Sequence, residues 1–420
     1  MSSRAKNQGA GAVVASVWVL FLGTALVMAG NGLQGSLLGI RSDIEGFATP
    51  AIGIVMASYY AGFLVGSLTI PARLASVGHI RVFAGLASLT SSVALIHYLV
   101  VGVFTWSLLR FITGVCLSGL YVTIESWLNE RATNATRGRL LAVYMVVVTT
   151  SVGSGQLLLG VADPSGPGLF ITASILISLA IVPLALSQVP APALEAPAKV
   201  SIRALFRAAP LGVVAGALVG ASNGAIFGLG AVFATRIGMD PGRAGLFVGA
   251  SIVGATLTQY PIGHLSDRFP RRRVIFAVAM AAAGVAGAGT AVDPDSLLLF
   301  AVALLYGSLA FPMYSLAVSH INDLVSDDQL VATAGGVLFV YGVGSIAGPI
   351  AASLMMTLLG PVGYLWSLSG FFAPVAAYSL YRLMTKARPG QKQFVSLPPR
   401  TSLVAARLAE PRPNDDPAAS

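Results

Sequence analysis

Apolar residues run along this chain in long unbroken stretches that short polar segments separate. A membrane-spanning helix needs about 20 such residues, and the runs are continuous rather than alternating, which indicates helices instead of strands. The first run is too long for the core of a signal peptide and has no convincing cleavage site, so we expect it to be retained. The pattern predicts twelve spans, with approximate bounds at 13–38, 50–73, 82–101, 104–128, 140–161, 168–187, 210–233, 243–264, 274–292, 297–321, 331–358 and 363–383.

The two halves of the chain carry the same pattern. At a nearly constant offset, the matched positions include Asn31 and Asn223, Gly62 and Gly254, Gly114 and Gly307, and Tyr121 and Tyr314. Duplication in a very apolar chain predicts an all-α integral membrane protein with two pseudo-symmetric six-helix bundles and a site between them. The predicted units are a first bundle at 1–187, a cytoplasmic linker at 188–209, a second bundle at 210–385 and a disordered cytoplasmic tail at 386–420.

Composition supports the bilayer as the solvent of this chain. Hydrophobic residues make up 55% and charged residues 10%, and a water-soluble protein of this length could not cover its surface with so few charges. The net charge is +9, but the basic side chains lie in loops between apolar runs, which argues against nucleic-acid binding.

The distribution of basic residues predicts the orientation in the membrane. With the N-terminus inside, only Arg41, Arg236 and Arg243 of the 25 Lys and Arg residues fall outside, and Arg110 falls within a span. By the positive-inside rule, we expect a multi-pass protein of the cytoplasmic (inner) membrane with both termini cytoplasmic.

The loop after the eighth predicted span carries the most specific motif. Residues 263–273 read GHLSDRFPRRR, which resembles the signature loop of the major facilitator superfamily, Gly-x-Leu-x-Asp-Arg-x-Gly-Arg-Arg, with Pro270 at the second glycine. The equivalent first-half loop, ending at Arg81, is degenerate, because Ala75 stands where the family has aspartate.

Further motifs extend this resemblance over residues 13–385. Arg110-x-x-x-Gly114 resembles the pattern of the family's fourth span, and the run at 121–129 resembles the YcaD-like branch. Gly344-x-x-x-Gly348-Pro349 resembles the antiporter motif, but the family carries that motif on span 5, so it does not decide for antiport. The resemblance implies two bundles that rock around a central cavity lined by spans 1, 4, 7 and 10, driven by a substrate gradient that is often coupled to protons.

The resemblance also implies a cytoplasmic gate of ion pairs that holds an outward-open state. The alternative is a set of solvated basic loops without such a role. The gate candidates are Arg81, Glu130 and Arg137 in the first half, and Gly263, Asp267, Arg268, Arg272 and Asp323 in the second.

The fourth span carries a polar stripe. Its residues fall within an arc of about 80° at 3.6 residues per turn. Charged groups in a span cost about 2.5–3.5 kcal/mol each and usually face an interior or a watery cavity, so we expect the stripe to face the cavity. The counterpart on the tenth span keeps the spacing but loses both charges. The stripe residues are Arg110, Gly114, Ser118, Tyr121 and Glu125, and their counterparts are Ala303, Gly307, Phe311, Tyr314 and Val318.

Glu125 is the candidate proton-coupling carboxylate, because it lies about 7.5 Å deeper than Glu130 along the helix. The alternative is a structural carboxylate paired with an arginine in the cytoplasmic vestibule. Arg110 lies about 22 Å from Glu125 along the axis, so the two do not pair. Arg110 could bind an anionic or carbonyl-bearing substrate, or it could bond to loosened backbone of a neighbouring helix.

Other polar groups complete the candidate cavity. Asn31, Gln34 and Asn223 could contact substrate at locally broken helices, or they could form interhelical amide bonds. Tyr121 and Tyr314 could face each other across the cavity or simply pack, and His320 could titrate near neutral pH or be satisfied in the packing.

We therefore predict a secondary active transporter of a small solute, coupled to protons, with a passive facilitator as the alternative. No phosphate-binding Gly-x-x-x-x-Gly-Lys loop occurs, and the scattered His residues and single Cys lack metal-ligand spacing. We expect no cofactor, no metal and no nucleic acid, with a small-molecule substrate, the lipid bilayer and protons as partners, and a monomer. An integral-membrane enzyme or a non-transporting sensor is less consistent with the pattern.

Overall fold

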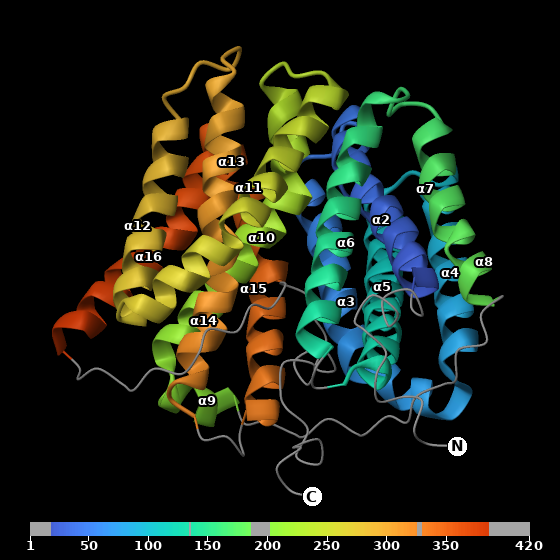
Figure 1. Cartoon of the computed structure of the whole chain (residues 1–420). Helices are drawn as coiled ribbons and strands as arrows, with labels where there is room; N and C mark the ends of the chain where they lie inside the picture. The colour runs from blue at the N-terminus through green and yellow to red at the C-terminus, as the bar shows by residue number, and fades with distance from the viewer. Residues whose placement is uncertain (1–17, 134–135, 186–201, 326–329, 386–420) are drawn as a thin grey trace, which may run out of the picture.

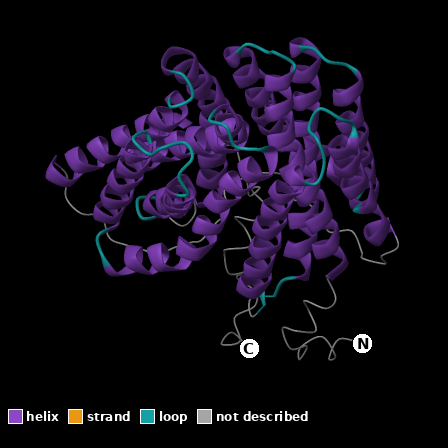
Figure 2. Ribbon diagram, turned by 90° about the horizontal axis from the view of Figure 1, so that it is seen from above, coloured by secondary structure: helices purple, strands orange, loops and turns teal. Residues whose placement is uncertain are grey.

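The computed structural model describes residues 18–133, 136–185, 202–325 and 330–385. The predicted disordered tail and most of the predicted linker lie outside these residues. Every regular element in the described ranges is helical (Figure 2). The first half contains α2 (Trp18–Ile44), α3 (Thr49–Val77), α4 (His79–Leu99), α5 (Val103–Arg131), α6 (Arg137–Leu157), η2 (Leu158–Gly160), α7 (Gly168–Leu179) and α8 (Ile181–Ala185).

The second half repeats this order. A short helix, α9 (Ile202–Ala208), lies within the predicted linker and precedes the first long helix of this half. The elements that follow are α10 (Pro210–Arg236), α11 (Pro241–Arg268), α12 (Arg271–Gly289), α13 (Leu298–Ala310), α14 (Pro312–Asn322), α15 (Leu330–Leu359) and α16 (Gly363–Thr385).

The helices agree with the predicted spans. Within the described ranges, 11 helical segments are long and apolar enough to cross a membrane, and α16 occupies the place of the twelfth predicted span. The tenth predicted span is divided into α13 and α14 at Phe311, immediately before Pro312. Proline has no N–H to continue the helical ladder, so a break at this point is expected. The prediction of an all-α membrane protein with two six-helix bundles is confirmed.

Close helix packing gives the sequence repeat a physical reason. In the first half, a Cβ on Gly62 would lie 1.9 Å from the carbonyl oxygen of Phe111, and one on Gly114 would lie 2.0 Å from that of Tyr59. The repeat-related Gly254 and Gly307 meet the backbone of their partner helices in the second half equally closely, at 2.0 Å. Only glycine allows backbones to approach this closely, and small residues are the usual means of helix association in membranes.

The two bundles stand side by side (Figures 1 and 2). They meet through α2 with α10, α3 with α15, and α6 and η2 with α11. We call the face that carries loops 161–167 and 237–240 the far side, and the opposite face, where α9 lies, the α9 side (Figure 1). Close backbone contacts join the halves on the far side, where a Cβ on Gly160 would lie 3.1 Å from the Cα of Gly242.

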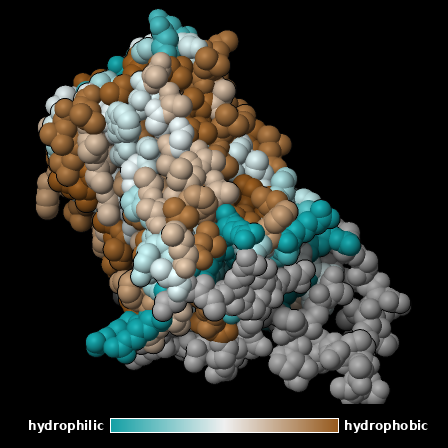
Figure 3. Space-filling model, turned by 90° about the vertical axis from the view of Figure 1, so that its left-hand side faces the viewer, coloured by the Kyte–Doolittle hydropathy of each residue, from teal (hydrophilic) through white to brown (hydrophobic). Residues whose placement is uncertain are grey.

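The strongly hydrophilic residues of the flank in Figure 3 lie near its two ends, and hydrophobic residues interspersed with weakly polar ones lie between them. Large hydrophobic side chains are exposed along the outer helices, among them Leu257, Met280, Leu298 and Leu380. Such side chains suit helices that face lipid, because the bilayer interior cannot solvate polar groups.

Candidate functional site

Helix α5 places most of the predicted stripe in the interior of the protein. Arg110, Ser118, Tyr121 and Glu125 are all buried, and Glu125 is fully inaccessible. The stripe does not face one common space, because Gly114 lies against the backbone of α3 and the charged groups at its two ends have different neighbours.

Glu125 is bonded to a phenol on the neighbouring helix. The Tyr144 hydroxyl on α6 donates a hydrogen bond of 2.9 Å to Oε1 of Glu125. Tyr121 lies within electrostatic range of Tyr144, and Tyr314 from the second half lies within range of Glu125. The carboxylate is therefore hydrogen-bonded to a tyrosine of its own half and interacts electrostatically with a tyrosine of the other half.

Tyr314 connects this group to a second polar pair. Its ring packs edge-on against that of Tyr341 on α15, with centroids 5.0 Å apart. Asn223 on α10 is fully buried, and its Nδ2 donates to the Tyr341 hydroxyl at 3.1 Å. Tyr121 packs against Phe63, at 5.8 Å, so each of these two tyrosines has a ring contact within its own half.

Arg110 contacts an aromatic ring on α3. Its guanidinium lies 4.5 Å from the centroid of the Tyr59 ring, a distance typical of a cation–π contact. Tyr59 was not among the predicted site residues.

The buried polar side chains near α2 differ in whether they have hydrogen-bond partners. Gln34 is fully buried, and neither its amide nitrogen nor its amide oxygen has a hydrogen-bond partner among the described residues. The Ser118 hydroxyl is likewise buried without a recorded partner. Gln156 on α6, which was not among the candidates, accepts from Ser36 at 2.6 Å and donates to the carbonyl oxygen of Gly32 at 3.0 Å. These bonds fix α2 against α6.

In the predicted gate of the second half, the ion pairs are formed by Arg271, which lies in the motif but was not among the candidate residues. Its Nη1 lies 2.6 Å from Asp323 and its Nη2 lies 3.5 Å from Asp267, while Nε donates to the Ser266 hydroxyl at 2.9 Å. The candidate Arg272 is also buried, and its backbone carbonyl accepts from Ser379 at 2.9 Å. The recorded ion pairs of this cluster join helices of one half.

Other gate and cavity candidates take more varied positions. Arg137 donates to Asn129 at 3.4 Å. His320 is buried on α14. Of the remaining candidates, Gly263 and Asn31 are buried, and Arg81, Glu130 and Arg268 are exposed.

The far side holds an ion pair between the halves that was not among the predicted gate residues. Arg236 at the end of α10 contacts Asp43 at the end of α2 through Nε, at 3.1 and 3.2 Å, and through Nη2, at 2.6 Å. Its Nη1 donates to the Thr49 hydroxyl at 2.9 Å. All four contacts connect the second half to the first.

A neighbouring cluster on the far side stays within the first half. Arg41 contacts Glu45 and the backbone carbonyl oxygens of Pro164 and Ser165. The Ser165 backbone N–H and hydroxyl donate to Asp163 at 2.8 and 2.5 Å. These bonds hold the pKa of the Asp163 carboxyl below its ordinary value.

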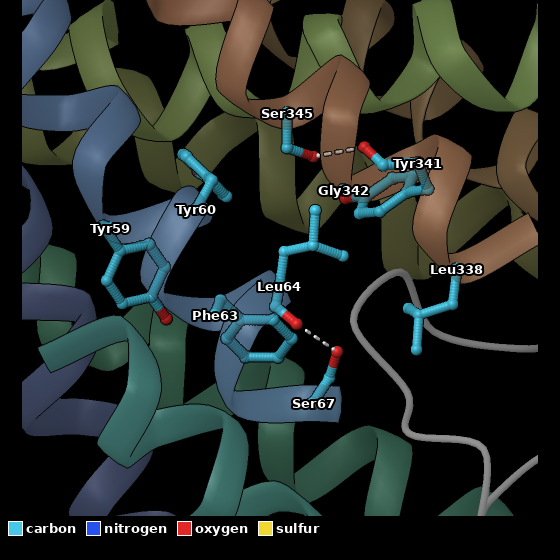
Figure 4. Close-up of a pocket in the computed structure, with 9 residues that line it drawn as sticks. All are labelled: Tyr59, Tyr60, Phe63, Leu64, Ser67, Leu338, Tyr341, Gly342 and Ser345. Atoms are coloured by element: carbon cyan, nitrogen blue, oxygen red, sulfur yellow. Dashed lines mark hydrogen bonds between the residues drawn. The ribbon is translucent and has the colours of Figure 1, made fainter. Parts of the chain in front are cut away.

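A pocket lies between α3 and α15, and so between the two halves (Figure 4). Its empty volume is about 340 Å³, part of it open to solvent. Tyr60 and Phe63 line the α3 side, and Tyr341, Gly342 and Ser345 line the α15 side. None of the lining residues carries a charge. Within the described ranges, no group of three His, Cys, Asp or Glu side chains could hold a metal ion.

Comparisons with known proteins agree on one family. Residues 212–411 match the sequence profile of the Major Facilitator Superfamily. The chain is 28% identical to the "Uncharacterized MFS-type transporter YcaD" of Escherichia fergusonii over 347 residues, which is 81% of this chain and 88% of the relative. It is 27% identical to "Uncharacterized MFS-type transporter YE1530" of Yersinia enterocolitica, over 90% of this chain and 97% of the relative.

Solved structures show the same fold at low sequence identity. A mutant of the nucleoside transporter NupG superimposes with a TM-score of 0.77 at 15% identity, over 88% of this chain and 100% of the NupG chain. A bacterial homologue of the human lysosomal transporter Spinster, in an inward-facing and occupied conformation, gives 0.72 at 14% identity, over 88% of this chain and 96% of the homologue.

Proposed function

Because the chain belongs to the major facilitator superfamily, with the YcaD-like transporters among its relatives, we propose that it is a proton-coupled carrier of a small solute. The solute would cross the membrane as the two bundles rock about their interface. Protons moving down their gradient would drive the cycle. The observation that carries the proton coupling is a fully buried carboxylate, Glu125, bonded to Tyr144 and within range of Tyr314 from the opposite half.

Burial makes the charge of Glu125 costly, so its protonation state can report on conformation. A carboxylate enclosed in the protein loses hydration that only good hydrogen bonds replace. Tyr144 supplies one such bond from the same half. Tyr314 belongs to the other half, so any rocking of the bundles changes the surroundings of the carboxylate. A group whose surroundings change in this way can take up a proton on one side and release it on the other.

The contacts on the far side support an assignment of the conformational state. The Asp43–Arg236 pair and the Gly160–Gly242 approach close that face between the halves. With both termini cytoplasmic, as the basic residues predict, the far side is the exterior, and the conformation is inward-facing. In this orientation, Arg271 and its partners would lie at the cytoplasmic ends of the helices.

Glu125→Gln tests the proposal in proteoliposomes that contain a pH-sensitive dye. A panel of candidate solutes is added under an imposed pH gradient, and both solute accumulation and proton entry are followed. We expect the variant to lose proton-driven accumulation and solute-dependent proton entry, while it still exchanges labelled solute across the membrane.

Asp295→Asn is the matched control, because it makes the same carboxylate-to-amide change at an exposed loop position. It should behave like the unchanged protein. Accumulation that persists in Glu125→Gln would remove this carboxylate from the mechanism. Solute flux with no proton movement in the unchanged protein would identify a passive facilitator instead.

A further inference from the structure

Three helix ends of the second half bring basic side chains together on the α9 side. Arg272 lies in the first turn of α12, His320 in the last turn of α14, and Arg382 in the last turn of α16. The Ser379 hydroxyl on α16 donates to the backbone carbonyl of Arg272 at 2.9 Å, which holds these two helix ends together. Arg382 interacts electrostatically with Arg272, and both arginines interact with His320. We call Arg272, His320 and Arg382 the basic cluster.

The basic cluster contains hydrogen-bonding groups that the described residues do not satisfy. Nε of Arg382 and Nδ1 of His320 are buried and have no hydrogen-bond partner among those residues. The carboxylates of Asp267 and Asp323 both contact Arg271. Within the described ranges, Arg382 takes part in no ion pair. Buried polar and charged groups without partners are costly, so the cluster calls for an anion that its donors can bond.

The sequence repeat indicates that the fold does not require basic groups at these positions. The first-half equivalents of Arg272 and His320 are Ile80 and Trp127. Trp127 belongs to the hydrophobic core of the first half, and Ile80 packs against that core. The same corner of the scaffold is therefore closed by apolar side chains in one half and carries positive charge in the other. Packing alone does not explain this difference, whereas a ligand of the second half does.

The surface beside the basic cluster suits lipid. Helices α12 and α16 lie on an outer flank of the molecule (Figure 1). Tyr381 and Met384, close to Arg382 in the chain, are 56% and 79% exposed, and the ring of Tyr381 stacks on that of Tyr378 with centroids 6.2 Å apart. Tyrosines gather where the apolar interior of a membrane meets the headgroups. Arg382 is partly exposed, so a headgroup at this depth can reach its side chain.

We propose that the basic cluster binds the phosphate of an anionic phospholipid in the leaflet on the α9 side. Guanidinium groups match phosphate oxygens through paired hydrogen bonds. The N-terminus of α12 adds to the attraction, because no side chain among the described residues caps it and N-terminal N–H groups favour anions. Basic pockets between membrane helices are suited to lipid headgroups. The site belongs to one half and does not depend on the proposed transport function.

Lipid binding to the purified full-length protein tests this proposal. The protein is stripped of lipid in detergent and titrated with phosphatidylglycerol or with phosphatidylcholine of the same acyl chains, and bound lipid is counted by native mass spectrometry. We expect phosphatidylglycerol to bind tighter by roughly tenfold or more, because the choline group of the other lipid places a cation beside the arginines. Equal affinities for the two lipids would overturn the proposal.

Substitutions connect the preference to the basic cluster. Arg382→Gln and Arg272→Ile should each reduce the preference for phosphatidylglycerol by roughly tenfold, since each removes charge-assisted hydrogen bonds. Arg272→Ile installs the residue of the first half, and Arg382→Gln changes a partly exposed side chain. Arg273→Gln is the matched control, because it removes an exposed arginine from the same turn of α12. Melting temperatures without lipid show which variants are folded. A preference unchanged in Arg382→Gln, or reduced equally in Arg273→Gln, would refute the site.

Inorganic phosphate distinguishes a lipid headgroup from a soluble anion at the same cluster. We expect a large excess of inorganic phosphate to leave phosphatidylglycerol bound, because free phosphate has no acyl chains to cover the exposed apolar side chains of α16. Complete displacement of the lipid by inorganic phosphate would overturn the lipid assignment and make the ligand a soluble phosphate.

Discussion

The contact between Asp43 and Arg236 joins the two halves on the far side, so its removal should favour the conformation in which that side opens. Three nitrogen–oxygen contacts of 2.6, 3.1 and 3.2 Å and a fourth to Thr49 make it a charge-assisted, forked interaction. Such hydrogen bonds contribute about 1.5–3 kcal/mol each when well shielded. The two side chains are 23% and 26% exposed, and solvent screening lowers the value of exposed pairs towards about 1 kcal/mol or less. We therefore expect the whole contact to contribute about 1–2 kcal/mol to the closed state.

A loss of this size should be directly measurable. Asp43→Asn should shift the equilibrium between closed and open far-side states by roughly 5- to 30-fold, since 1–2 kcal/mol corresponds to that ratio. Spin labels at Ala162→Cys and Ala291→Cys, two exposed far-side positions in different halves, report their separation by double electron–electron resonance. Cys116 is the single cysteine of the chain and is buried, so Cys116→Ala gives a clean background. In the Asp43→Asn variant, the distribution of distances between the two spin labels should gain a population at longer distances.

A double-mutant cycle decides whether the pair itself is responsible. Arg236→Gln alone should cause a similar shift, and the double variant should add little to either single change. Arg41→Gln is the control, because the recorded partners of Arg41, Glu45 and the backbone of Pro164 and Ser165, belong to its own half. Distances unchanged in both single variants, or fully additive shifts in the double variant, would refute the role of this pair as a connection between the halves.

Three further predictions follow from packing and charge. Gly114→Ala should lower stability by about 1–3 kcal/mol or prevent folding, because its Cβ would meet the backbone of α3 at 2.0 Å. Thermal melting checks this, with Gly370→Ala as the control, because nothing lies within 4 Å of a Cβ at that position. Arg271→Ala should lower stability by about 3–5 kcal/mol, because it leaves the fully buried Asp323 carboxylate without its 2.6 Å partner. The double variant Arg271→Ala, Asp323→Asn should recover part of this loss in the same melting assay, because it also removes the buried charge. Tyr314→Leu should weaken the coupling between solute flux and proton entry in the liposome assay, if this side chain links the second half to the surroundings of Glu125. Coupling retained in full would contradict the link.

The helical framework follows from the sequence because its determinants are local or repeated. Continuous apolar runs have no structure available in a bilayer other than helices or closed barrels. The matched glycines Gly62 and Gly254, and Gly114 and Gly307, mark the same close approach in each half. The break at Phe311 could also have been read from the proline that follows it, although the apolar run itself gives no sign of it.

The side-chain partners of the candidate site residues could not be predicted from the sequence, because they depend on how each helix is rotated relative to its neighbours. One residue along a helix turns a side chain by about 100°, so the signature loop could not separate Arg271, which forms the recorded ion pairs, from Arg272. Tyr144 bonds to Glu125 across a helix pair, and no spacing within one helix indicates that contact. Tyr341 was missed because its repeat-related position is Val148, so the symmetry that marked Tyr314 gave no signal.

Because of these differences, each half carries a different pair of hydrogen-bonded polar side chains. The first half holds a carboxylate on α5 with a tyrosine from α6, and the second holds an amide on α10 with a tyrosine from α15. The position equivalent to Tyr144 is Val337 and the one equivalent to Glu125 is Val318, so neither pair has a copy in the other half. If the two bundles rock as proposed, the same motion would change the surroundings of both tyrosine pairs. The pairs lie near each other, because the ring of Tyr314 lies 5.0 Å from that of Tyr341 and Tyr314 interacts electrostatically with Glu125.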